Sequence, residues 1–445
     1  LDHIGVFSPV TKWSICLSHP DEMVETLKEA YRIATCGRPG PVHIDLPLDV
    51  QTRPLSRERL KVLEESSFRL FPLSPSGEHS AIREGVKLLV ESYRPVMIAG
   101  GGVHYSARAW KPLRSLAEYL GIPVATTFNG RGSFPEDHPL SAGRMGIHAP
   151  AYDDRLLAEA DVILAVGCRF AALSTRQWSN ISSNSALIHV DIDPKVIGRN
   201  YLAKVSIVGD AGKVLEALLE EAETYQNICA ERRRDWLKFL EEAKEAWRRS
   251  EWYRGTFSEG TPLKPQRVCT EIRRFFSRET VFTLDAGNNK LWCSTFLNIY
   301  EPSTWIQSGC FGPMGYALPA AIACRLARPE TPVVALCGDG GFYMTLHELS
   351  TAVQEEAPVL VCIFDDGALG TIKHHQRSYY GERFISVDLA NPDFAAVAEA
   401  FGCSGFEAEN PRQLRSALED GLRSVKSGRP AVIDIRIDER EPLPP

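Results

Sequence analysis

The chain has 445 residues, of which 44% are hydrophobic and 24% charged, with a formal net charge of −7 at pH 7. This size predicts two or three domains of an ordinary globular enzyme. The negative charge argues against nucleic acid or an anionic membrane as a partner, and no apolar stretch of about 18 residues predicts a membrane span. The 11 cysteines form no C-x-x-C pair, so we expect buried thiols in a reducing cytoplasm.

Residues 1–52 hold too few elements for a core of their own. A helix is expected over 21–35 and a strand over 41–47, with a turn containing Gly and Pro between them. One helix and one strand cannot bury enough apolar surface to fold alone. The chain also opens at Leu1 rather than at a methionine, so we expect this segment to be the end of a larger domain.

The middle of the chain predicts a second α/β unit between two connectors. Residues 53–76 are charged and then rich in Pro and Ser, which indicates a linker. Residues 77–222 alternate strand and helix patterns, with strands expected over 95–99, 123–127, 162–166 and 187–192 and a helix over 107–120. Residues 223–263 are rich in Glu, Arg and Trp and predict a charged helical connector with a solvated face.

The third unit, residues 264–445, contains the most informative segment. Two apolar runs, 333–337 and 359–364, flank a helical stretch expected over 343–356. Such a strand-helix-strand unit brings both strand ends to one edge of a parallel sheet, where doubly wound sheets bind ligands. The first run is followed by Asp339 and the second by Asp366, each beside glycines.

Two carboxylates beside glycines predict a diphosphate held through a divalent cation. Glycine lets a phosphate approach backbone N–H groups closely. Mg²⁺ takes oxygen ligands, usually one or two carboxylates together with phosphate and water. The alternative interpretation is a structural unit in which these aspartates only cap helices.

The segment from Gly338 to Gly341 resembles the Gly-Asp-Gly signature of thiamine-diphosphate (ThDP) enzymes, with the lead-in Ile322-Ala323 and Pro329 at the expected spacing. The resemblance implies Mg²⁺ ligands from Asp339, Asp366 and the backbone carbonyl of Ala368. Most members have Asn-Asn where this chain has Asp365-Asp366, but some members, notably the catabolic acetolactate synthases, also carry Asp at this position. Further residues implied to bind the cofactor are Gly338, Gly340, Gly341, Leu369 and Gly370.

Upstream segments resemble acetohydroxyacid (acetolactate) synthases in particular. Gly287, Asn288 and Asn289 follow a strand expected over 280–285, where relatives hold the diphosphate; a simple Gly-Asn turn is the alternative. The segment from Ser308 to Gly315 resembles S-G-G-x-G-x-M-G, which implies that Gly312 contacts the cofactor and that Met314 forms the wedge between its two rings. A core methionine after a Gly-rich turn is the alternative.

His375 occupies a position that the resemblance connects with substrate choice. Biosynthetic synthases have there a tryptophan that favours 2-oxobutyrate as the second substrate. A histidine would give this side of the substrate pocket a smaller, polar and titratable side chain, which is compatible with a decarboxylase or with other carboligations. A solvent-facing histidine pair, His374 and His375, is the alternative.

The first two units resemble domains of the same family. Residues 36–47 match the end of its pyrimidine-binding domain, which implies that the earlier part, with the activating glutamate, is missing through truncation, a late gene start or a separate chain. Residues 77–222 resemble the six-stranded Rossmann-like central domain, where synthases also bind FAD. The segments that could contact FAD are 100–102, 127–129, 146–148, 169–170, 191–192 and 210.

Taken together, the resemblance implies an α/β protein with a parallel-sheet ThDP-fold domain, a Rossmann-like central domain and a truncated N-terminal ThDP-fold remnant. It implies ThDP, Mg²⁺ and possible FAD as cofactors, and a homodimer or homotetramer, with a regulatory subunit left open. The expected reaction is decarboxylation and carboligation of a 2-oxo acid such as pyruvate. A pyruvate-oxidase-like or simple decarboxylase, and a non-catalytic ThDP- or flavin-binding chain, are the alternatives.

Overall fold

The computed structural model describes residues 1–55, 74–225 and 230–444. The described strands form one two-stranded and two six-stranded sheets, and all pairings within the three sheets are parallel. Each large sheet has helices on both faces, as parallel sheets require. The expected α/β class is therefore confirmed, and most of the 53–76 linker lies outside the described residues.

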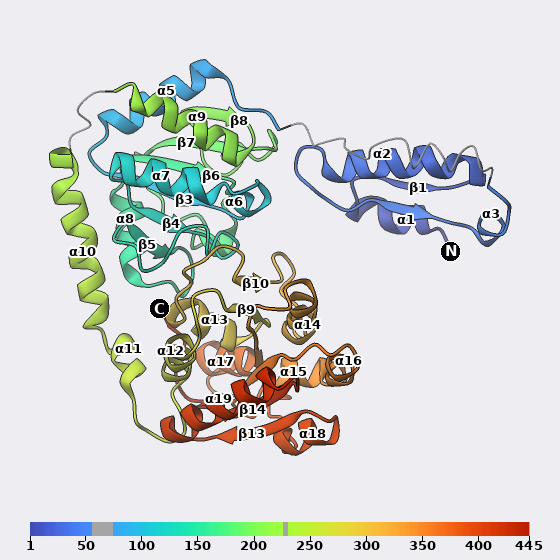
Figure 1. Ribbon diagram of the computed structural model, residues 1–445. Helices are drawn as coiled ribbons and strands as arrows, with labels where there is room; N and C mark the ends of the chain where they lie inside the picture. Colours follow the sequence, from blue (N-terminus) through green and yellow to red (C-terminus); the bar gives the residue numbers. More distant parts are fainter. Residues whose placement is uncertain (56–73, 226–229, 445) are drawn as a thin grey trace.

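The N-terminal unit is a small parallel pair covered by one long helix (Figure 1). Strand β1 (Ser14–Cys16) pairs with β2 (His43–Asp45), and α2 (Met23–Thr35) connects them. Shorter elements flank the pair: α1 (His3–Phe7), η1 (Ser8–Val10), η2 (Pro20–Glu22) and α3 (Leu48–Gln51). The prediction of one helix and one strand missed β1, because a three-residue strand with a polar first residue has no detectable period. Leu17, Val24, Ala30 and Val50 are buried in this unit, whereas Val10 and Leu48 remain exposed.

The central unit is a six-stranded sheet in the order β5-β4-β3-β6-β7-β8. Its strands are β3 (Pro95–Ala99), β4 (Val124–Thr126), β5 (Ser141–Arg144), β6 (Val162–Val166), β7 (Ala186–Asp191) and β8 (Val205–Val208). The chain starts in the middle of this sheet at β3, runs to one edge and returns to β6. The order therefore reverses between β3 and β6, which is where open α/β sheets bind ligands. The four predicted strands are confirmed, and the two edge strands were not predicted.

Alternate residues of each central strand face different helices. Met97 and Ala99 pack in one core with α5 (His79–Glu91), α7 (Trp110–Leu120) and α9 (Ala211–Glu223). Val96 and Ile98 pack in the other core with α8 (Ala151–Glu159) and α10 (Arg234–Arg248). The other described helical elements in and next to the central unit are α6 (Gly102–Tyr105), η3 (Ala172–Ser174) and η4 (Ala230–Arg233). This two-sided burial explains the continuous apolar runs of the strands.

The predicted connector is helical but only partly solvated. Helix α10 packs Trp236 and Leu240 into the core of the central sheet, also buries Ala243, and exposes charged side chains on its other face. It runs alongside the central unit toward the C-terminal one, where α11 (Glu251–Arg254) and η5 (Gly255–Phe257) follow (Figure 1). None of the helices in the described part of the chain combines the length and hydropathy needed to cross a membrane.

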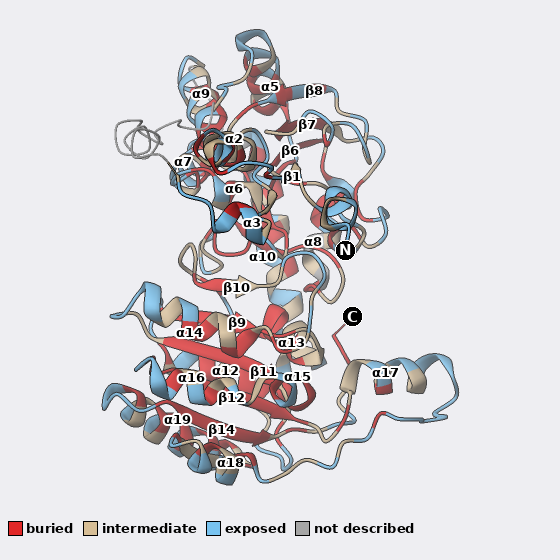
Figure 2. Ribbon diagram, turned by 90° about the vertical axis from the view of Figure 1, so that its right-hand side faces the viewer, coloured by how far each residue is buried: buried red, intermediate tan, exposed pale blue. Residues whose placement is uncertain are grey.

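The C-terminal unit has the sheet order β10-β9-β11-β12-β14-β13. The strands are β9 (Val281–Leu284), β10 (Trp305–Gln307), β11 (Val333–Gly338), β12 (Leu360–Asp365), β13 (Ser404–Ala408) and β14 (Ala431–Arg436). One face is covered by α12 (Pro265–Phe275), α13 (Asn288–Phe296) and α19 (Pro411–Lys426), and the other by α14 (Ala317–Ala327), α16 (Glu348–Gln354) and α18 (Phe394–Ala400). Figure 2 shows the buried strands between helices whose outer faces are exposed.

One predicted helix in this unit is wrong. The stretch expected over 343–356 is two helices, α15 (Asp339–Thr345) and α16, and the first begins directly at the end of β11. Gly338 is extended and precedes the helix, so Gly340 and Gly341 lie inside its first turns. Because glycine is unfavourable within helices, the pattern placed the start too late. Neighbouring side chains lie so close to Gly340 and Gly341 that a larger residue would clash, which explains glycine here despite its low helix propensity.

Candidate functional site

The tips of β11 and β12 bring Asp339 and Asp366 together. The two strands pair in parallel, with Gly338 opposite Phe364, so each aspartate follows the end of its strand at the same sheet edge. The backbone N–H of Ala368 donates to Asp339 Oδ2 and to Asp366 Oδ1, at 3.2 Å in each case. The two carboxylates predicted to bind a metal thus converge on one backbone amide, and Ala368 is itself buried.

The electrostatics of this corner suit a cation. Burial raises the pKa of the Asp339 carboxyl to about 6, against the lowering effect of its hydrogen bond from Asn391. Burial, and then the neighbouring Asp339 charge, raise the pKa of Asp366 to about 8. Adjacent carboxylates such as the buried Asp339 and the partly buried Asp366 are stable together only when a positive charge or shared protons offset them. A divalent cation supplies that charge and takes just such oxygen ligands.

The predicted metal site has only two acidic side chains. Across residues 1–55, 74–225 and 230–444, no three His, Cys, Asp or Glu side chains are grouped so that they could hold a metal ion. A backbone carbonyl, such as that of Ala368, and phosphate oxygens would have to complete the coordination. This donor set fits Mg²⁺, which keeps few protein ligands and binds together with substrate or cofactor phosphates.

The glycines at this corner are required by close contacts and by backbone conformation. A Cβ on Gly340 would lie 3.0 Å from both Leu369 Cδ2 and Met314 Cε. A Cβ on Gly341 would lie 2.3 Å from Asp285 Oδ2, and one on Gly370 would lie 2.3 Å from Asp366 Oδ2. Two other predicted glycines have left-handed φ values, +133° at Gly287 and +57° at Gly312, which favour glycine.

The two predicted asparagines have different surroundings. Asn288 lies at the corner: its Oδ1 accepts a hydrogen bond from Thr371 Oγ1 at 2.8 Å, and its Nδ2 lies beside Gly370. Asn289 is buried, and its Nδ2 donates to the backbone carbonyl of Leu336 in β11 at 3.0 Å. Asn288 therefore lies beside Gly370 and Thr371, whereas the amide of Asn289 is hydrogen-bonded to β11. Contact of either residue with a diphosphate stays a prediction.

Met314 and His375 come from two different segments near this corner. Met314 is half-buried after the Gly-rich turn, and its methyl group lies against Gly340 at the start of α15. His375 is on α17 (Gly370–Tyr379), exposed and in edge-to-face contact with Tyr379. The structure thus places Met314 against Gly340, next in sequence to Asp339, and His375 on the helix that starts next to Asp366. Their roles as wedge and substrate wall stay predictions.

Sequence reasoning missed Asn391 and Arg436. Asn391 Nδ2 donates to Asp339 Oδ2 and to Asp365 Oδ1, at 2.8 Å each, and Arg436 pairs with Asp365 Oδ2. Both residues come from segments well downstream of the aspartates. No motif marks them, although Asn391-Pro392-Asp393 has the composition of a turn before a helix.

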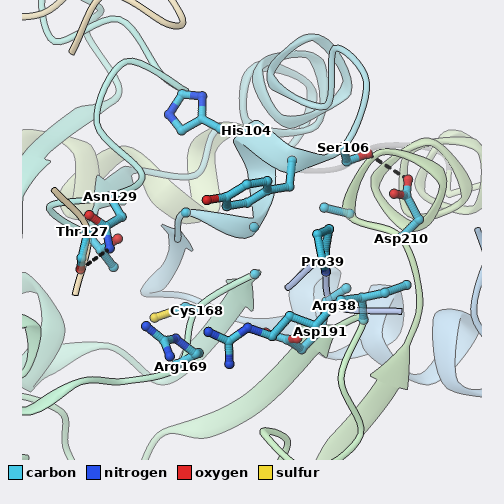
Figure 3. Close-up of a pocket in the computed structure, with 18 of the residues that line it drawn as sticks. Arg38, Pro39, His104, Ser106, Thr127, Asn129, Cys168, Arg169, Asp191 and Asp210 are labelled. Atoms are coloured by element: carbon cyan, nitrogen blue, oxygen red, sulfur yellow. Dashed lines mark hydrogen bonds between the residues drawn. The ribbon is translucent and has the colours of Figure 1, made fainter. Parts of the chain in front are cut away.

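A second site lies in the central unit, at the strand order reversal between β3 and β6. A cavity of about 870 Å³ there is lined by parts of five of the six segments proposed for FAD, with 146–148 as the exception (Figure 3). Arg38 of the N-terminal unit and Trp305 of the C-terminal unit also line it. Three atoms of lining residues are buried without a hydrogen-bond partner among the described residues: His104 Nδ1, Trp305 Nε1 and Gln307 Oε1. Because these atoms expose almost no surface, they do not open onto the cavity.

The glycines of 100–102 have a structural explanation independent of any ligand. A Cβ on Gly100 would lie 2.1 Å from the carbonyl oxygen of Gly167, and one on Gly102 would lie 2.6 Å from the Cα of Gly167. They allow the loops after β3 and β6 to touch. Only Gly101 and Gly102 of this segment line the cavity.

Comparison with known proteins matches two domain families. Residues 285–435 match the model described as thiamine pyrophosphate enzyme, C-terminal TPP binding domain, and residues 82–218 match the central domain of the same enzymes. The first matched region contains Asp339 and Asp366, and the second contains many, but not all, of the residues that line the cavity.

Curated relatives match along the whole chain. A probable acetolactate synthase large subunit of Methanocaldococcus jannaschii is 37% identical over 100% of this chain and 74% of its own length. The acetolactate synthase isozyme 3 large subunit of Escherichia coli is 33% identical over 100% of this chain and 76% of its own length. The acetolactate synthase large subunit of Corynebacterium glutamicum is 34% identical over 98% and 68%, respectively.

Proposed function

Because the chain belongs to the thiamine pyrophosphate (ThDP) enzymes, we propose that it decarboxylates a 2-oxo acid such as pyruvate and joins the remaining fragment to a second carbonyl compound. Its relatives are named as acetolactate synthase large subunits. The observation that carries the proposal is the convergence of Asp339 and Asp366 on the N–H of Ala368, within the region matched by the TPP binding domain.

In this proposal the chain's own residues anchor and orient the cofactor. Asp339, Asp366 and the carbonyl of Ala368 hold Mg²⁺, and Asn288 faces the diphosphate from the start of α13. Met314 supplies an apolar surface over Gly340 on which the cofactor bends, and His375 forms part of the acceptor wall. ThDP, when bound, supplies a carbanion that attacks the keto carbon and an electron sink for the loss of CO₂.

We further propose that the central cavity binds FAD. Its volume of about 870 Å³ lies within the usual range for cofactor sites. Arg38, Arg169 and Lys213 line it and could pair with a diphosphate, while Asp191, at the end of β7, could accept ribose hydroxyls. The absorbance spectrum of the purified protein tests this: bands near those of free flavin are expected, and a colourless protein that takes up no added FAD would contradict it.

A homodimer or homotetramer is part of the proposal. Large apolar side chains are exposed on the segments that carry or follow the predicted cofactor residues: Phe311, Tyr343, Met344, Tyr379 and Ile385. An apolar surface of this kind beside a site suits coverage by a second copy of the chain. Sedimentation at increasing protein concentration tests the proposed homodimer or homotetramer, and a fully active monomer would contradict that proposal.

We also propose a cytoplasmic location, because all ten described cysteines are free thiols.

Anaerobic incubation with pyruvate, Mg²⁺ and ThDP separates the candidate reactions. Acetolactate or acetoin as product supports carboligation, and acetaldehyde supports a simple decarboxylase. Release of acetate or acetyl phosphate only when oxygen is admitted supports a pyruvate-oxidase-like enzyme. ThDP binding without any product identifies a non-catalytic binding chain.

A further inference from the structure

We propose that Asn391 is a positioning residue that orients the Asp339 carboxylate toward the metal; this inference rests on the proposed ThDP function. One side-chain nitrogen, Asn391 Nδ2, donates to Asp339 Oδ2 and to Asp365 Oδ1, at 2.8 Å each. The two acceptors lie 52 and 26 residues away in the sequence. Asn391 thus bridges the tips of the two central strands of the site.

The direction of the Asn391 amide follows from its surroundings. Both groups that face its nitrogen are carboxylate oxygens, which accept hydrogen bonds and do not donate them when ionised. Rotation of the amide by 180° would place its oxygen against both carboxylates. The Oδ1 atom in the present orientation is buried without a hydrogen-bond partner among the described residues. In this orientation both N–H groups of Asn391 are hydrogen-bonded to carboxylates, and its oxygen has no partner among the described residues.

The backbone around Asn391 is held against the metal-binding loop. Leu369 N donates to Val387 O at 2.7 Å, and Leu389 N donates to Gly367 O at 2.8 Å. This short antiparallel pairing places the segment leading to Asn391 along the loop that contains Ala368. After Asn391, Asp393 accepts a hydrogen bond from Ala396 N at 2.8 Å and caps α18. Asn391 is therefore fixed between a strand-like pairing and a helix start.

The two hydrogen bonds of Asn391 have different effects, one on the orientation of Asp339 and the other on the repulsion between Asp339 and Asp365. Its Oδ2 accepts from both Asn391 and Ala368, and its Oδ1 accepts from its own neighbour, Gly340 N, at 2.8 Å. These donors restrict the rotation of the carboxylate. The bond to Asp365 Oδ1 meanwhile places a donor between two acids that would otherwise repel each other; the opposite oxygen of Asp365 is paired with Arg436. Outer-shell donors of this type tune metal affinity.

Calorimetric titration of the 445-residue chain with ThDP, at a series of Mg²⁺ concentrations, tests the inference. Asn391→Ala is expected to raise the half-saturating Mg²⁺ concentration by about 10-fold or more. Asn391→Asp keeps the shape but replaces the donor by a third acid, so a larger loss is expected. With Mn²⁺ in place of Mg²⁺, the electron paramagnetic resonance spectrum of the ThDP complex is expected to change in Asn391→Ala, because the coordination geometry changes.

Asp393→Ala is the matched control. It removes the cap of α18 two residues away and touches neither Asp339 nor Asp365, so it is expected to lower the melting temperature and leave the Mg²⁺ requirement unchanged. The inference is overturned if Asn391→Ala folds and needs no more Mg²⁺ than the wild type, or if Asp393→Ala raises the requirement equally. A wild-type chain without Mg²⁺-dependent ThDP binding would instead refute the proposed function, and this inference with it.

Discussion

Asp339 and Asp366, 27 positions apart, share a single hydrogen-bond donor, the backbone N–H of Ala368, at 3.2 Å from each carboxylate. Asp339→Ala removes one of the two predicted acidic metal ligands and leaves the N–H groups of Asn391 and Ala368 without that acceptor. We expect ThDP binding in the presence of Mg²⁺ to be lost, as measured by calorimetry. Retention of wild-type affinity would refute the anchor assignment.

Asp366→Asn should be much milder than the change at Asp339. Burial and the adjacent Asp339 charge raise the pKa of Asp366 to about 8, so the metal-free corner already disfavours a second ionised acid. An asparagine keeps an oxygen ligand and removes the repulsion. We expect ThDP affinity within about threefold of the wild type by the same titration. A loss as large as that of Asp339→Ala would show that both negative charges are needed.

Met314→Ala tests the wedge. The methyl group of Met314 lies against Gly340, so its loss removes apolar contact beside the bound cofactor and leaves the carboxylates untouched. We expect the rate of pyruvate consumption to fall by about 10- to 100-fold, with a smaller change in ThDP affinity. Met314→Leu conserves volume and should retain most activity. Equal rates in all three proteins would assign Met314 to packing alone.

Asp285 makes stability depend on pH in a way that one substitution can isolate. It is fully buried at the end of β9. Burial raises its pKa to about 6, although its Oδ1 accepts from Ala317 N at 2.6 Å. The folded state therefore binds the proton more tightly than the unfolded state, so this contribution to stability is present below about pH 4 and is lost as the pH rises through 6.

Asp285→Asn should remove that dependence. The free energy of unfolding of the wild type, relative to the variant, should fall by about 3 kcal/mol between pH 4 and pH 7, at about 1.4 kcal/mol per pH unit. Asparagine retains an acceptor for Ala317 N. Urea unfolding of both proteins across this range gives the difference. A constant difference would show that Asp285 titrates normally.

The joint between the central and C-terminal units contains a buried ion pair. Arg131 donates to Glu136 through two nitrogens, at 2.6 and 2.8 Å, and also to the carbonyls of Cys293 and Leu297. Glu136→Ala leaves the arginine buried and unpaired, so we expect a loss of about 3 to 5 kcal/mol in urea unfolding. The exposed pair Arg114–Glu118 is the control, and Glu118→Ala should cost less than about 1 kcal/mol. Similar losses in the two variants would contradict this role.

Most interior strands were predictable because they are buried on both faces, although the interior strand β14 was not predicted. Such strands are continuous apolar runs of about five residues, and β3 and β6 begin and end where the pattern predicted. Edge strands lack this signal. Ser141–Arg144 of β5 contains a glycine and an arginine, and its burial depends on neighbours that the local sequence does not specify.

What the sequence by itself determined is the sheet edge at which Asp339 and Asp366 lie, since a strand-helix-strand unit has only one common handedness and its two strand ends share one edge. What only the tertiary structure decided is the set of partners around them. Asn391 and Arg436 reach the corner because β14 pairs with β12 and because the segment before α18 pairs with the Ala368 loop. Such contacts depend on long-range packing, which leaves no local period or spacing in the chain.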